Sequence, residues 1–187
     1  MIIVEGFNGS EGRLLWFCPP DSWKPTAGQR EGCGGSWKVA NGTLELHPPA
    51  KKDFWRKTYY EPTLCKDDGP ILYASLPVAE YFTVTAEFAL KAVCQFDQAG
   101  IAIRLSPEHW IKTGIEVVDQ IPRLSCVVTN VYSDWSTAPY SPASTTTTTS
   151  GGTPAPLKAT IDLTRKRTGK KVYHSYHSHL PHPTTDT

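Results

Sequence analysis

Three segments in the middle of the chain alternate between apolar and polar residues at every second position. In the first, one side of an extended chain receives only apolar residues: Phe82, Val84, Ala86, Phe88 and Leu90. The same alternation recurs over residues 98–105 and 110–117. Because successive side chains of a β-strand point to opposite faces, this period predicts three strands, each with one buried face. No segment keeps a period of 3.6 residues with caps, so the sequence predicts an all-β fold.

Shorter strands are expected around these three, at residues 43–46, 71–76 and 123–130. The 16 prolines and 14 glycines of the chain fall between such runs, where they favour turns. Many short strands at regular spacing are typical of a β-sandwich or a barrel. We expect two packed antiparallel sheets.

The length of 187 residues predicts one domain. We expect the sandwich to occupy residues 1–143 and a low-complexity loop of Ser, Thr, Gly and Pro to occupy residues 144–156. Residues 157–187 are expected to supply the last strand or strands, with a hairpin turn around Gly169, and then a divergent C-terminal tail.

Composition and charge exclude several classes of protein. The net charge is +1, which does not point to nucleic acid or to a membrane surface. No apolar run approaches the ~18 residues of a membrane span, and Met1–Val4 lacks the features of a signal peptide. The five cysteines show no CxxC spacing, which argues against a disulfide framework and a zinc ribbon. We therefore expect a cytoplasmic protein with reduced thiols, without membrane or nucleic-acid partners.

The polar side of the two central strands is the most informative candidate site. It carries residues that bind ligands in many proteins, namely Gln98, Arg104, Trp110, Lys112 and Glu116. One interpretation is a solvated face with cross-strand ion pairs, such as Arg104 with Glu116. Another is a concave polar sheet on which a Trp ring stacks against sugars, and a third is a protein-binding face.

Catalytic and metal motifs are weak in this sequence. A glycosidase needs two suitably spaced carboxylates, but Glu116 and Asp119 fall on opposite faces of a strand. No cysteine or serine lies in a recognisable nucleophile motif. The histidines at 174, 177, 179 and 182 are interpreted as part of a flexible tail and not as a metal site. We expect no cofactor.

Three further segments have mainly structural interpretations. The aromatic and basic residues of 51–62 could stack nucleic-acid bases, but a strand with alternate aromatic burial is the preferred interpretation. Asp134 and Trp135 are expected in a loop at the rim of the sheet. Asn41 and Gly42 match a turn.

Several motifs together resemble a known family: CPPDSW (18–23), KKDFWRKTYYEP (51–62) and, above all, FDQAGIAIRLSPEHWIKTGIEVVDQIPRLSCVVTNVYSDWST (96–137). The sequence resembles the concanavalin-A-like domain family of unknown function that includes a fungal regulation-of-enolase protein. The resemblance covers most of residues 7–140. It implies a jelly-roll β-sandwich, a cytosolic setting and, through a yeast member, a link to enolase and galactose metabolism. The family has no assigned catalytic residues; its polar signature matches Asp97, Gln98, Trp110, Lys112, Glu116, Asn130, Asp134 and Trp135.

Together these observations predict a non-enzymatic binding or regulatory protein of carbohydrate metabolism, with enolase or another metabolic enzyme as the partner. The alternative is a lectin-like module that binds carbohydrate on the concave polar face, and a divergent glycoside hydrolase is a remote third. Under the first two, alanine at Lys112 and Glu116 should abolish binding and leave the protein folded.

Overall fold

The computed structural model describes residue 7 and residues 15–17, 34–75, 81–140, 157–168 and 171–179. In this part of the chain every regular element is a β-strand, and every strand pair is antiparallel. The all-β prediction is confirmed, while the jelly-roll order of connections stays a prediction. The residues described here include no helix long and apolar enough to cross a membrane.

The chain divides into two compact units, residues 1–77 and 78–187. The first unit contains three two-stranded sheets, β1–β6, β2–β3 and β4–β5. Their strands are β1 (Leu15–Phe17), β2 (Ser36–Ala40), β3 (Thr43–His47), β4 (Phe54–Arg56), β5 (Cys65–Asp67) and β6 (Ile71–Tyr73).

The β2–β3 hairpin turns at the predicted place. Asn41 has a φ of 51° and Gly42 a φ of 70°, and Asn-Gly with two positive φ angles is the preferred two-residue hairpin turn. Across the strands, the Lys38 ammonium lies 2.6 Å from the Glu45 carboxylate. On the same strand as Glu45, His47 Nε2 lies 2.8 Å from that carboxylate. These bonds from Lys38 and His47 lower the pKa of Glu45.

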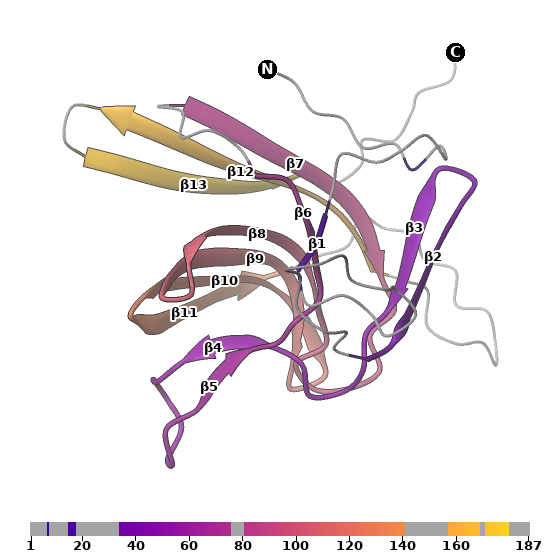
Figure 1. Ribbon diagram of the computed structural model, residues 1–187, viewed down its shortest axis with the longest axis horizontal. Coiled ribbons are helices and arrows are strands. Elements are labelled where there is room, and N and C mark those ends of the chain that lie inside the picture. The colour runs from indigo at the N-terminus through magenta and orange to yellow at the C-terminus, as the bar shows by residue number, and fades with distance from the viewer. Residues whose placement is uncertain are drawn as a thin grey trace. The chain divides into compact units, whose positions relative to one another are not determined.

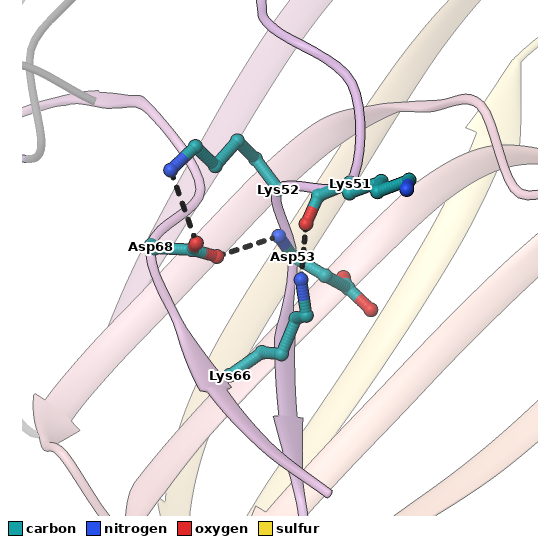
Figure 2. Close-up of polar contacts among 5 residues, drawn as sticks. All are labelled: Lys51, Lys52, Asp53, Lys66 and Asp68. Carbon is teal, nitrogen blue, oxygen red and sulfur yellow. Dashed lines mark hydrogen bonds and ion pairs between the residues drawn. The ribbon is translucent and has the colours of Figure 1, made fainter. Parts of the chain in front are cut away.

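A polar network closes the base of the β4–β5 hairpin (Figure 2). The Asp68 carboxylate accepts hydrogen bonds from the Lys52 ammonium at 3.2 Å and from the Asp53 amide at 3.1 Å, and Lys66 donates to the Lys51 carbonyl. Partial burial raises the pKa of Asp68, but the Asp53 amide and the charges of Lys52 and Lys66 outweigh it, so the pKa falls below its ordinary value. The network therefore holds Asp68 ionised.

We expect Asp68→Asn to lower the free energy of unfolding at pH 7 by about 1 kcal/mol, because the charged acceptor is lost. A carboxylate whose pKa is lower in the folded state stabilises the protein above its unfolded pKa, and this contribution disappears as the pH falls through the folded pKa. The difference between variant and wild type should therefore close as the pH is lowered below 4 (about the unfolded pKa of Asp). Urea unfolding across this pH range measures it, and a difference independent of pH would contradict the assignment.

The second unit contains the long strands, in two sheets of order β11-β10-β9-β8 and β13-β12-β7 (Figure 1). The strands are β7 (Tyr81–Leu90), β8 (Gln98–Ser106), β9 (His109–Val118), β10 (Ile121–Asn130), β11 (Tyr132–Pro139), β12 (Leu157–Thr168) and β13 (Lys171–His179). Within this unit, β7 and β12 lie over β8, and the four strands β8–β11 bend together along their length.

The hydrophobic core of the second unit lies between these two sheets. The buried centre consists of Ile101, Ile111, Ile115, Cys126 and Tyr140. The apolar side of β7 packs against it through Val84, Ala86, Phe88 and Leu90, as do Ile103 and Leu124. The predicted apolar faces of these strands are therefore confirmed. Leu105 is the exception: the register of β8 shifts between Arg104 and Ser106, and Leu105 is 73% exposed.

The Cys126 thiol should react only slowly with thiol reagents in the folded protein. Burial raises the pKa of its thiol, whereas Cys65 and Cys94 are exposed. Because thiolate fraction and access both fall on burial, we expect Cys126 to react with a maleimide more than about tenfold more slowly than Cys94. Peptide-resolved mass spectrometry after timed labelling measures these rates. Labelling of Cys126 as fast as Cys94 in the native protein would contradict its place in the core.

Two segments differ from expectation. Asp134 and Trp135 lie within β11, paired with Val128 and Val127 of β10, and not in a rim loop. Residues 172–179, interpreted from sequence as part of a tail, belong to β13, which pairs with β12. The predicted hairpin is confirmed, since Thr168 pairs with Lys171. Gly169, the low-complexity segment 144–156 and His182 lie outside the described residues.

Candidate functional site

The sheet β8–β11 has a second side, opposite the core, which we call the polar face. The pairing of its strands places the side chains of this face in four rows that cross the sheet. The rows, from one end to the other, are Arg104–Trp110–Thr129–Ser133, Ala102–Lys112–Val127–Trp135, Gly100–Gly114–Ser125–Thr137 and Gln98–Glu116–Arg123–Pro139.

Six of the nine predicted site residues meet on the polar face: Gln98, Arg104, Trp110, Lys112, Glu116 and Trp135. The suggested pair of Arg104 with Glu116 is wrong. Arg104 lies opposite Trp110, whereas Glu116 lies opposite Gln98. The two rows are six residues apart along β8, about 20 Å at ~3.3 Å per residue, which no ion pair spans.

Glu116 instead belongs to a buried polar cluster with Ser125 and Trp135. Glu116 is 6% exposed, and its carboxylate accepts a hydrogen bond from the Ser125 hydroxyl at 2.5 Å and one from the Trp135 indole at 3.2 Å. The indole nitrogen also lies 3.0 Å from the Ser125 oxygen. Since a buried carboxylate is costly unless it is hydrogen-bonded, these donors account for its presence there.

Small residues make room for this cluster. The backbone of Trp135 lies in the row of Lys112, and its indole extends across the next row to contact Glu116. That intervening row contains Gly100, Gly114 and Ser125. The ring also contacts Phe96 edge-on, with centroids 6.4 Å apart. The polar face thus carries an indole fixed between a carboxylate and an aromatic ring, with Lys112 half-buried in the same row as Trp135.

The other three predicted residues are placed elsewhere. The Asp97 carboxylate caps the turn before β8, where it accepts hydrogen bonds from the amides of Val93 and Cys94, both at 2.8 Å. Asn130 and Asp134 alternate with residues of the polar face and therefore lie on the opposite side of the sheet. Asp97 has a structural role, and the last two are separated from the other candidates.

Sequence reasoning missed Ser125, Phe96 and the paired glycines 100 and 114. The pattern did place both glycines on the polar side of their strands, but their opposition depends on the pairing of β8 with β9. No group of three or more His, Cys, Asp or Glu residues able to hold a metal ion occurs in the parts of the chain that the structure describes.

Comparison with known proteins identifies relatives in fungi. The chain is 40% identical over 99 residues to Regulation of enolase protein 1 of Saccharomyces cerevisiae, covering 53% of this chain and 48% of that protein. It is 32% identical over 125 residues to an uncharacterized protein of Emericella nidulans, covering 65% and 57%. The chain thus spans about half the length of these relatives.

The fold is similar to a solved structure. A crystal structure of a functionally unknown protein from Saccharomyces cerevisiae matches with a TM-score of 0.60 and 25% identity, over 90% of this chain and 79% of that one. A family model described as a protein of unknown function, DUF1349, matches residues 34–152. These residues include β2–β11 and the whole polar face. The chain therefore belongs to the DUF1349 family of proteins of unknown function.

Proposed function

We propose that this protein is a non-enzymatic, cytoplasmic binding protein that regulates a metabolic enzyme, and that this enzyme is enolase. The main support is the 40% identity to a protein named Regulation of enolase protein 1. That match covers only part of each chain, so the name concerns the relative and the partner of this chain needs its own test.

The proposed contact surface is the part of the polar face at the half-buried residues Arg104, Lys112 and Trp135, because the other residues near its centre, Trp110 among them, are buried. It groups two cationic residues, Arg104 and Lys112, with the indole of Trp135 on one side of a single sheet. Arg and Trp are enriched at the centres of protein interfaces. The Glu116 and Ser125 hydrogen bonds hold the indole in one orientation, which lowers the entropy lost on binding.

The test is direct binding to purified enolase, measured by biolayer interferometry. We expect the double variant Arg104→Ala, Lys112→Ala to bind at least about tenfold more weakly, since loss of ~1.4 kcal/mol changes Kd tenfold. Lys38→Ala, which removes an exposed lysine of the β2–β3 hairpin, is the matched control and should bind as wild type. Absence of wild-type binding, or an equal loss in the control, would refute the proposal.

Carbohydrate is the other ligand class to test on the polar face, because Trp135 and Lys112 share a row there. A ligand at about 100 times its Kd stabilises a folded protein by ~2.7 kcal/mol, which raises the melting temperature by several degrees. A thermal melt with mono- and oligosaccharides therefore tests whether the polar face binds carbohydrate or only a protein partner. A rise with one sugar class, lost in Trp135→Phe, would favour a lectin-like function over the enzyme partner.

A further inference from the structure

Residues 56–64, which are the last residue of β4 and the loop that joins it to β5, present aromatic side chains to solvent. We call this segment the tip loop. The rings of Trp55, Tyr60 and Tyr59 form a series of edge-to-face contacts, with centroids 6.0 Å and then 5.2 Å apart. Exposure rises along the series from 8% at Trp55 through 40% at Tyr60 to 82% at Tyr59. The Tyr59 ring therefore packs against Tyr60 on one side and is otherwise exposed to solvent.

Hydrogen bonds hold the tip loop in one conformation. The Trp55 indole donates to the Thr58 carbonyl at 2.7 Å, and the Lys57 amide donates to the Leu64 carbonyl at 2.7 Å. The Thr58 amide donates to the Arg56 carbonyl at 2.9 Å. Below the loop, Asp68 links Lys52 to the Asp53 amide (Figure 2). Tyr59 is therefore carried by a hairpin whose conformation these hydrogen bonds stabilise.

The backbone of the tip loop is strained at the exposed Tyr59 and at the half-buried Lys57. Tyr59 has a φ of 71° and Lys57 a φ of 67°, in the left-handed region that glycine adopts freely and other residues adopt at a cost. Glycine at position 59 would relieve this strain and would lose little buried contact. Residues held in such sparsely populated backbone conformations cluster at active sites and ligand-binding sites.

We infer that the tip loop is a contact surface for a folded protein partner, which receives the Tyr59 ring in a pocket and meets Arg56 and Lys57 with acidic side chains. Tyrosine and arginine are the residue types that dominate binding energy at such interfaces. A tyrosine has two rotatable side-chain bonds, so fixing it costs little entropy. This inference rests on the proposed function and adds a second contact surface for the same partner.

The experiment compares Tyr59→Gly with wild type for binding to purified enolase and for thermal stability. We expect the variant to bind at least tenfold more weakly, while its melting temperature stays unchanged or rises because the strain is relieved. Tyr59→Ala, which removes the ring but keeps a side chain at the same φ, should weaken binding equally. Tyr132→Ala is the control, since Tyr132 is also exposed, and it should bind as wild type. Wild-type binding should also weaken as the salt concentration is raised, because salt screens the attraction of Arg56 and Lys57 for acidic side chains.

The alternative outcomes separate this inference from the proposed function. If wild type binds enolase and both Tyr59 variants bind equally well, the tip loop is not a contact and the proposed function stands. A Tyr59→Gly variant that melts earlier and keeps its affinity gives Tyr59 a structural role and overturns the inference. If wild type itself does not bind enolase, both are refuted.

Discussion

Alanine in place of Gly114 is expected to lower the free energy of unfolding by about 3 kcal/mol, the upper end of the usual cost of overpacking. A Cβ at this position would overlap the Ala99 carbonyl oxygen and lie 2.8 Å from both the Ala99 carbonyl carbon and the Gly100 Cα. These are backbone atoms of the neighbouring strand, so no side-chain rotation relieves the overlap. Strands β8 and β9 would have to separate at the centre of the sheet, which disturbs the core on its other side.

Chemical denaturation followed by circular dichroism measures this loss. Ala102→Ser is the control, because Ala102 is exposed on the same face of β8, and such changes stay within about 0.5 kcal/mol. Gly100→Ala should cost a similar amount to Gly114→Ala, since its Cβ would lie 2.7 Å from the Gly114 Cα. The double variant should cost less than the sum, because one separation of the strands accommodates both methyl groups. Full additivity, or a stable Gly114→Ala protein, would contradict the close approach of the strands.

The long strands of the second unit were predictable because each buries one face against a sheet. Phe88 on β7 and Ile115 on β9 are parts of alternating runs, and both lie at the core between the sheets. β11 lacked such a signal, because polar residues such as Ser133 and Asp134 occupy both of its faces. It forms because the backbone of β10 offers hydrogen-bonding partners along its whole length.

The candidate site was predictable only one strand at a time. Alternation correctly placed Lys112 and Glu116 on the same face of β9, but it carries no information about which residue of the next strand lies opposite. Pairing between strands therefore decides that Glu116 meets Ser125 and not Arg104. The burial of Glu116 also changes the expected effect of its substitution. The expectation that alanine at Glu116 leaves a folded protein assumed a solvated face, whereas removal of a buried carboxylate should destabilise the protein.

Leucine in place of Glu116 is expected to lower the free energy of unfolding by about 3 kcal/mol, because two hydrogen bonds to a buried carboxylate are lost. The buried Ser125 hydroxyl loses its acceptor, and the Trp135 indole keeps only the Ser125 oxygen of its two acceptors. Glu116→Gln should cost only about 1 kcal/mol, since the amide oxygen can accept both bonds. Urea unfolding measures the stability of both variants. Glu87→Gln is the matched control, because Glu87 is exposed on β7, and its stability should be close to that of wild type.

The two substitutions also distinguish a structural role of Glu116 from a role in binding. If Glu116→Gln folds and binds enolase as wild type while Lys112→Ala folds and does not, the carboxylate supports the indole and the lysine makes the contact. If Glu116→Leu is as stable as wild type, the buried cluster does not stabilise the sheet, and Glu116 returns to the set of residues that a ligand can reach. A Glu116→Gln protein that is stable but cannot bind would show that the charge itself is recognised, because the amide keeps the acceptor, the volume and the orientation of Trp135.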